Sequence, residues 1–180
     1  AQFWSHKNHV YILNGINSVE KIFGVQLSAI FAGSDKGNKS HVLQVANNLG
    51  LADRVIFTGF VSNKEMPYLY KQALALTMPS YFGPTNLPPM EAFQLGVPVI
   101  YGDINGAKEQ LGDAAILVDL KNEITFANAL ISLQDKSLRK KMIDKGHKQL
   151  EYINSKRDIA DSTFKSILCE YKIRRQSWGK

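Results

Sequence analysis

The sequence predicts an α/β domain with a doubly wound parallel sheet and helices on both faces. Short runs rich in Val, Ile and Leu alternate along the chain with longer segments of helical period, and these runs are continuously apolar. Continuous apolar strands are typical of parallel sheets that are buried on both faces, and alternation with helices indicates βαβ units. In such sheets, ligands bind outside the carboxyl ends of the strands.

Five apolar runs are the expected strands of this sheet. They occupy residues 27–33, 54–60, 74–78, 97–102 and 115–120. The first residues, up to Trp4, are considered as the end of a further strand. The loops that directly follow these strands are therefore the expected location of a ligand site.

The segments between the strands carry helix signals. Residues 39–50 have apolar side chains at a helical period and stop at a glycine. Ser62 and Glu65 have the spacing of a capping box, which begins a helix. Residues 87–96 begin with prolines and end at a glycine, an asymmetry that helices prefer. Two or three more helices are expected between residues 122 and 171.

Length and composition favour one globular domain. The chain has 180 residues, of which 44% are hydrophobic, and we expect a single domain over residues 1–180. No apolar run approaches the roughly 18 residues of a membrane-spanning helix. The single cysteine, Cys169, fits a reducing compartment, so a cytoplasmic location is expected. Because Ala1 lies inside an ordered motif and no initiator Met precedes it, we expect a piece of a longer protein.

The chain is basic, with a net charge of +6 and a pI of about 9.3. Such a charge favours anionic partners without choosing among phosphates, nucleic acid and a membrane surface. Much of the excess lies in residues 136–149 and 171–180. We interpret these segments either as solvated faces of amphipathic helices or as a peripheral contact with anionic lipid headgroups. The sequence contains no RNP-like aromatic run and no zinc-ligand set, so nucleic acid is not an expected partner.

The stretch MPSYFGPTNLPPMEAFQLGVPVI concentrates turn residues between a strand and a helix. A helix N-terminus with unpaired N–H groups binds anions, and Gly83 lets the backbone approach a ligand closely. Thr85 and Asn86 can donate side-chain hydrogen bonds or cap the helix. Glu91 lies in the first turn, where a carboxylate can accept hydrogen bonds from sugar hydroxyls, as acids do on ribose. The alternative is a rigid turn in which Glu91 is a partner of the helix dipole.

The first residues, AQFWSHKNH, place a polar cluster after an apolar triplet. Lys7 in this cluster can meet a diphosphate as a point charge. His6 and His9 have a spacing that can share a metal, but no cysteine or carboxylate nearby completes a ligand set, so no metal is expected. Ordinary loop or cap chemistry is the alternative for both histidines.

The segment IFAGSDKGNKS is close to a P-loop. A strand precedes it, a helix follows it, and Lys39 and Ser40 are correctly placed, but Asn38 stands where the motif needs a glycine. A P-loop-like phosphotransferase is therefore an alternative. Gly33 and Ser34 are ligand-loop candidates in either case. No G-x-G-x-x-G pattern supports a dinucleotide site.

Four segments of the chain match one pattern in order. They are FWSHKNH, which looks like an R-x4-K segment with Lys7 as the lysine, then VIFTGFVSNKEMPYLYKQALALTMPS, PPMEAFQLGVPVI and KEQLGDAAILVDL. Together they resemble the C-terminal, donor-binding domain of family 4, or group 1, retaining glycosyltransferases of GT-B fold. The resemblance covers nearly the whole chain. It adds to the fold prediction a two-domain parent enzyme, whose N-terminal acceptor domain is expected to lie outside this chain.

The resemblance implies roles for the candidate residues. Lys7 would neutralise the diphosphate of a nucleotide sugar, and Asn86 and Leu87 would supply backbone donors to it. The second Glu of the family's E-x7-E motif corresponds to Glu91, which would bind ribose hydroxyls. Lys7 and Glu91 are therefore the expected catalytic residues, and metal-independent electrostatic stabilisation of the leaving group is the expected contribution.

Two positions depart from the family pattern. The first Glu of the E-x7-E motif corresponds to Gly83, so Thr85 or Asn86 would take over contacts to the donor sugar. The arginine of the R-x4-K segment corresponds to Gln2. His6 or His9, if protonated, would replace the positive charge of this arginine.

The predicted function is donor binding in a retaining, mannosyltransferase-like hexosyltransferase. A sugar would move from a GDP- or UDP-sugar to a hydroxyl acceptor, in the synthesis of bacterial surface polysaccharide or lipopolysaccharide. The nucleobase would lie against the backbone near Phe60 and Val61. The isolated chain is expected to bind nucleotide without turnover. A non-catalytic nucleotide-sugar-binding module is the alternative nearest to this prediction.

Overall fold

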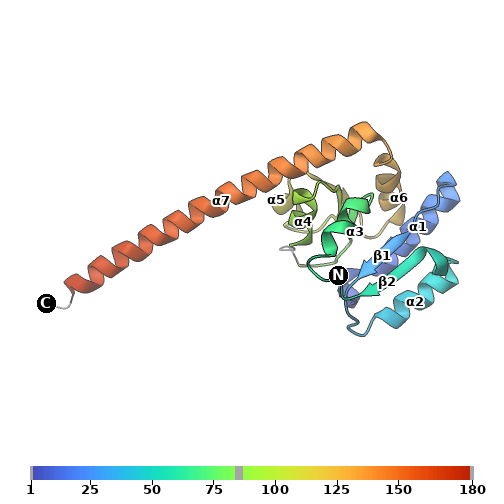
Figure 1. Ribbon diagram of the computed structural model, residues 1–180, viewed down its shortest axis with the longest axis horizontal. Helices are drawn as coiled ribbons and strands as arrows, with labels where there is room; N and C mark the ends of the chain where they lie inside the picture. Colours follow the sequence, from blue (N-terminus) through green and yellow to red (C-terminus); the bar gives the residue numbers. More distant parts are fainter. Residues whose placement is uncertain (1, 84–86, 179–180) are drawn as a thin grey trace.

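The computed structural model describes residues 2–83 and 87–178, a small α/β body from which one long helix projects (Figure 1). The strands are β1 (Ala29–Ala32), β2 (Val55–Gly59), β3 (Leu76–Met78), β4 (Val99–Gly102) and β5 (Ala115–Val118). The helices are the 3-10 turns η1 (Ser5–Lys7) and η2 (Ala52–Arg54), and α1 (His9–Phe23), α2 (Lys39–Asn48), α3 (Met66–Gln72), α4 (Pro88–Gln94), α5 (Ala107–Leu111), α6 (Glu123–Ser132) and α7 (Lys136–Ser177).

The named strands pair in parallel as two sets, β1–β2 and β3–β4–β5. The predicted parallel α/β class is confirmed, although each strand is shorter than its apolar run. Pairing of Met78 with Tyr101 places the loops after β3 and β4 side by side. The first residues, considered as the end of a further strand, form an isolated parallel bridge between Phe3 and Asp35, and the chain turns into η1 two residues later.

Two apolar cores lie on opposite faces of β4, whose residues are all buried. Ile100 packs into one core with α1 and with Phe126 of α6. Val99 and Tyr101 pack into the other core with Phe93 of α4. Helices therefore cover both faces of this strand, which is the doubly wound arrangement that the sequence predicts.

α1 is a helix that the sequence signals did not indicate. Its apolar residues Ile12, Ile16 and Val19 are buried at helical spacing, but glycine and asparagine residues interrupt the run. Gly15 lies so close to α6 that a Cβ there would be 2.1 Å from the Phe126 Cδ1 atom. Helix propensity alone is weak in this segment, so the stability of α1 comes from its close packing against α6.

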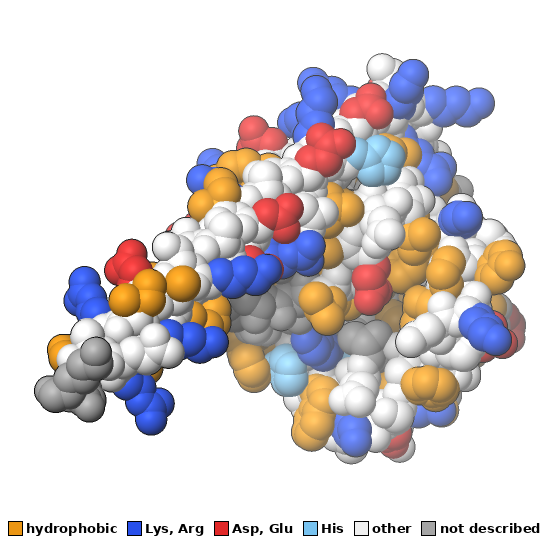
Figure 2. Space-filling view, turned by 60° about the vertical axis from the view of Figure 1, so that its left-hand side comes forward, with side chains coloured by type: hydrophobic (Ala, Val, Ile, Leu, Met, Phe, Trp, Pro, Cys, Tyr) orange, Lys and Arg blue, Asp and Glu red, His pale blue; other side chains and the backbone are white. Residues whose placement is uncertain are grey.

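α7 runs unbroken for 42 residues. Its first part packs on α4, where a Cβ on Gly146 would lie 2.7 Å from the Phe93 Cδ1 atom. Met142, one turn earlier, is buried in the core that contains Ile100 and Phe126. From residue 155 to residue 178 every side chain is exposed. In Figure 2 this projecting part carries hydrophobic side chains among basic and acidic ones. None of the helices in the described part of the chain combines the length and apolar character needed to cross a bilayer.

Candidate functional site

Residues 2–8 lie across the carboxyl ends of both strand sets. The Phe3 N–H donates to the Ser34 carbonyl at 3.1 Å, in the loop after β1. The Tyr81 N–H, in the loop after β3, donates to the His6 carbonyl at 2.9 Å. The N-terminal segment therefore ties together two loops that are far apart in the sequence, and it carries Lys7 between them.

The loops after β1 and β2 begin in contact. The Gly33 N–H donates to the Gly59 carbonyl at 2.7 Å, and Gly33 has a φ of 146°, a backbone conformation that favours glycine. Ser34 is exposed beside it. Beyond β2, Phe60 is 84% exposed and Val61 is partly buried. This apolar surface suits the flat face of a nucleobase.

Lys7 ends the short turn η1 and is partly buried. Burial lowers the pKa of its ammonium group. An ammonium that is already partly dehydrated loses less hydration when an anion binds, which favours a phosphate contact. Gln2, where the resemblance places an arginine, accepts a hydrogen bond from Trp4 Nε1 at 3.0 Å through Oε1. The Gln2 side chain is therefore directed to Trp4.

The two histidines do not supply the positive charge that an arginine would bring. Burial, and then the Lys7 charge, lowers the pKa of His6, while burial lowers the pKa of His9 to about 4. Their rings are also engaged separately: His6 stacks on Phe82 with centroids 4.3 Å apart, and His9 stacks on Phe3 at 4.7 Å. No group of three or more His, Cys, Asp or Glu side chains within the described ranges could hold a metal ion.

The N-terminus of α4 offers fewer donors than the sequence predicts. Pro88 and Pro89 lack an N–H, and the N–H groups of Met90 and Glu91 donate to the Leu87 carbonyl at 2.9 and 3.1 Å. The helix itself is therefore not the source of unpaired N–H groups that we expected. Any backbone donors to a phosphate must come from the loop that precedes the helix.

That loop is described only in part. Thr85 and Asn86, two of the predicted ligand residues, lie outside the described residues. Leu87, at the other end of the gap, is 74% exposed. Gly83 has a φ of 101°, and its carbonyl accepts a hydrogen bond from the Tyr101 hydroxyl at 3.2 Å.

Glu91 is exposed and oriented by a neighbouring helix. The Tyr70 hydroxyl in α3 donates to Glu91 Oε2 at 2.9 Å. Burial, reinforced by the Glu91 carboxylate, raises the pKa of Tyr70, so its hydroxyl keeps the proton and remains a donor. A carboxylate has about four acceptor positions. Glu91 can therefore keep this bond and still accept hydrogen bonds from a ligand.

In the loop after β1, the Asp35 carboxylate binds the backbone N–H groups that could otherwise bind an anion. Asp35 Oδ1 accepts from the Gly37 N–H at 2.8 Å and from the Lys39 N–H at 3.2 Å. These backbone hydrogen bonds lower the pKa of Asp35. In a P-loop, amides in this position point at phosphate oxygens. Because a side-chain anion already occupies them, the geometry does not favour the phosphotransferase alternative.

A hollow of about 420 Å³ opens at the carboxyl ends of β3 and β4. It is lined by Tyr81, Phe82, Gly83, Asp103, Ile104 and Asn105. Because Phe82 stacks on His6, the hollow adjoins the N-terminal segment that carries Lys7. Of these residues, Gly83 was the one individual candidate from the sequence.

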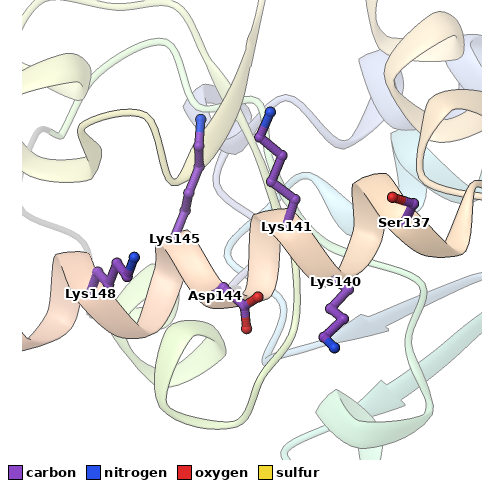
Figure 3. Close-up of a pocket in the computed structure, with 6 residues that line it drawn as sticks. All are labelled: Ser137, Lys140, Lys141, Asp144, Lys145 and Lys148. Carbon is purple, nitrogen blue, oxygen red and sulfur yellow. The ribbon is translucent and has the colours of Figure 1, made fainter.

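A second hollow, of about 410 Å³, lies on α7 (Figure 3). Figure 3 shows the Lys141 and Lys145 side chains extending to one side of the helix, and Lys140 and Asp144 to the other. Ser137 and Lys148 complete its lining. Since one helix supplies all of these residues, the feature is a basic surface rather than an enclosed site.

Three residues that shape the site, Asp35, Tyr70 and Tyr101, were not among the candidates from the sequence. The Asp35-x-Gly37 spacing is a local Asx-turn signal that could have identified the first of them. Tyr70 and Tyr101 contact Glu91 and Gly83 across 21 and 18 residues of sequence. No local pattern indicates those contacts.

The family model described as glycosyl transferases group 1 matches residues 1–149. The chain therefore belongs to the group 1 glycosyl transferase family. The carboxyl-end site described above is thus that of a member of this family.

Individual relatives agree with this assignment. The chain is 30% identical over 132 residues to the O-antigen chain mannosyltransferase RfbU of Salmonella typhimurium, covering 73% of this chain and 36% of that protein. A crystal structure of Anabaena HepE in complex with UDP superposes with a TM-score of 0.78 at 18% identity, over 92% of this chain and 47% of that one. The C-terminal domain of LpcC from Francisella tularensis gives a TM-score of 0.71 at 22% identity, over 84% and 81%. The chain thus spans less than half the length of RfbU and HepE, and the structural matches show the fold.

Proposed function

We propose that this chain binds the donor of a retaining hexosyltransferase, which transfers a sugar from a nucleoside diphosphate sugar to a hydroxyl acceptor. The observation that carries the proposal is the convergence at one edge of the fold. The N-terminal segment with Lys7 bonds to the loops after β1 and β3, and Glu91 stands at the start of α4 with its carboxylate oriented by Tyr70. Ligands of doubly wound domains bind at this edge.

Each candidate residue has a part in this proposal. Lys7 faces the diphosphate and stabilises the charge that develops on it as the leaving group departs. Glu91 accepts hydrogen bonds from the ribose hydroxyls. Leu87, with Thr85 and Asn86, belongs to the loop that supplies backbone donors. Phe60 and Val61 form the surface against which the base lies.

The proposal includes a biological setting. RfbU is named as an O-antigen chain mannosyltransferase, which supports a hexosyl donor and bacterial surface polysaccharide synthesis. HepE was crystallised with UDP, which supports a nucleoside diphosphate as the common part of the donor. The acceptor site would be supplied by a further domain, and the basic surface of α7 would allow a peripheral contact with an anionic membrane in the cytoplasm.

Calorimetric titration of the 180-residue chain with UDP, GDP and ADP, with and without Mg²⁺, tests the proposal. We expect one of the diphosphates to bind without a metal. Lys7→Ala and Glu91→Ala should each weaken that binding at least tenfold, because each removes a charge-assisted contact. Lys21→Ala and Glu151→Ala, which remove exposed charges in the last turn of α1 and on α7, should leave it unchanged. Binding that ignores Lys7 and Glu91, or that requires Mg²⁺, would contradict the proposed site.

A non-catalytic sugar-nucleotide module would bind in the same way but would never support transfer. The two readings separate in a longer protein that contains the acceptor domain. There, Glu91→Ala should abolish glycosyl transfer if the site is catalytic. The isolated 180-residue chain should show binding and no transfer.

A further inference from the structure

The hollow at the ends of β3 and β4 has a lining unlike that of a phosphate site. Of its six lining residues, Asp103 alone carries a charge, and none is Lys or Arg. A carboxylate repels a phosphate but accepts hydrogen bonds from hydroxyl groups. Asn105, beside it, can both donate and accept. The polar part of the lining therefore suits a neutral group with several hydroxyls.

The Asp103 side chain is available for such a contact. The backbone of Asp103 is fixed, because its amide N–H donates to the Val118 carbonyl at 2.9 Å and so extends the pairing of β4 with β5. The side chain is exposed. Among the described residues it has neither a hydrogen bond nor an ion pair.

The rest of the lining presents apolar rings. Tyr81 is 54% exposed and Phe82 is 61% exposed. His6 contacts both residues: its ring stacks on the Phe82 ring with centroids 4.3 Å apart, and its carbonyl accepts a hydrogen bond from the Tyr81 N–H. The C–H faces of a hexose pack favourably on such rings, because apolar surface is removed from water. Exposed aromatic rings beside a carboxylate and an amide form a lining that complements a sugar.

The two sides of the hollow are fixed relative to each other. Tyr101 is fully buried, and its hydroxyl donates to the Gly83 carbonyl at 3.2 Å. This bond joins the loop after β3 to the strand that leads into Asp103. Such a preformed site loses less conformational entropy when a ligand binds.

We propose that this hollow receives the sugar of the donor and that Asp103 selects a neutral hexose by accepting hydrogen bonds from its hydroxyls. The inference rests on the proposed function and adds the residue that selects the sugar and the exclusion of acidic sugars. A uronic acid would place a second carboxylate against Asp103 and would be disfavoured by like-charge repulsion.

Asp103→Asn in the 180-residue chain tests the assignment, because it keeps the shape of the side chain and removes its charge. The ligands are UDP and UDP-glucose, and GDP and GDP-mannose, each titrated by calorimetry. For the series that binds, affinity for the diphosphate alone should change less than twofold, while affinity for the nucleotide hexose should fall about tenfold. If the uridine series binds, UDP-glucuronate should gain relative to UDP-glucose in the variant.

Two further variants make the result specific. Asp113→Asn makes the same chemical change at an exposed position before β5, at the opposite edge, and should change neither affinity. Asn105→Ala should weaken the nucleotide hexose less than Asp103→Asn does, because it removes a neutral partner. Circular dichroism of each variant confirms that the fold is kept.

The outcomes separate this inference from the proposed function. If Asp103→Asn affects the diphosphate and the nucleotide hexose equally, or affects neither, Asp103 is not the sugar-selecting residue and the proposed function still stands. If the unaltered chain binds neither UDP nor GDP, the proposed function fails, and the sugar assignment fails with it.

Discussion

Two loops at the same edge of the fold were predicted to bind anions, and they differ in how their backbone N–H groups are used. In the β1 loop, residues 33–38, the Asp35 carboxylate accepts from Gly37 and from Lys39, the first residue of α2. In the β3 loop, residues 79–87, the following helix begins with two prolines, and its next two amides bond to the Leu87 carbonyl. In the β1 loop the backbone N–H groups bind a side-chain carboxylate of the loop itself. The β3 loop leads into a helix whose first N–H groups are either missing, at the prolines, or already bonded.

The difference shows that a helix N-terminus is an anion site only if its donors are unpaired. The macrodipole is present in both places, yet a phosphate needs N–H groups that point at it. For the phosphates, the contact that the described residues offer is therefore the positive charge of Lys7 rather than amides of α4. If this difference holds, changes in the β1 loop should alter the stability of the fold, and changes next to the β3 loop should alter nucleotide affinity.

Acidification should loosen the N-terminal segment that both loops share, and this is the largest expected effect. His9 is 4% exposed, and burial lowers its pKa to about 4, against about 6.5 in an unfolded chain. Between these values the unfolded state binds more protons, so stability falls as pH drops from about 6.5 to about 4, by on the order of 3 kcal/mol in total. Urea unfolding across this range measures the effect.

The matched controls for this prediction are His9→Gln and His41→Gln. His9→Gln removes the buried titrating ring and should flatten the profile, while His41→Gln alters an exposed ring and should not. An unchanged profile in His9→Gln would mean that another group causes the acid sensitivity.

Tyr70→Phe should lower nucleoside diphosphate affinity about tenfold, because Glu91 loses the hydroxyl that orients it. The fold should be kept, since phenylalanine fills nearly the same volume. Tyr68→Phe, on the same helix but 68% exposed, is the matched control and should bind normally. Equal affinity of both variants would show that Glu91 needs no support from α3. Calorimetry of the two variants gives the answer.

Asp35→Ala should lower the unfolding temperature by about 2–4 °C without weakening nucleotide binding, because it leaves loop amides without an acceptor. Asp53→Ala removes an exposed acid at the other end of β2 and should be neutral. Thermal unfolding followed by circular dichroism measures the shift. A large loss of nucleotide affinity in Asp35→Ala would show that the β1 loop takes part in binding, which would remove the contrast between the loops.

Lys39→Ala should have the smallest effect, less than about twofold on nucleotide affinity. Lys39 lies 5.7 Å from the Phe57 ring centroid, and its backbone N–H is engaged with Asp35. A P-loop would lose most of its affinity with this lysine. Titration of Lys39→Ala beside Lys7→Ala therefore compares the two loops directly, and a greater loss in Lys39→Ala would reverse the interpretation.

Local rules predicted much of the fold and only part of the site. Continuous apolar runs identified the parallel strands. The Ser62–Glu65 spacing forms the two bonds of a capping box: the Ser62 N–H donates to Glu65 Oε2 at 3.2 Å, and the Glu65 N–H donates to Ser62 Oγ at 3.4 Å. α1 was not predicted, because Gly15 is a poor helix former. The need for a glycine at this position becomes clear only from its close contact with Phe126 of α6. The same limit applies to the site: Glu91 was identified from local sequence, but the orientation of its carboxylate depends on tertiary contacts.

The anchoring of α7 has a mechanical consequence. At about 1.5 Å per residue, the exposed residues 155–177 extend roughly 35 Å beyond the body of the protein. The helix acts as a lever that is held at one end. From Gly146 to Ser177 it is about 47 Å long at about 1.5 Å per residue, so a tilt of about 5° at the contact between Gly146 and Phe93 moves the far end by about 4 Å. A small change in side-chain volume at that contact is therefore magnified at the C-terminal tip of α7.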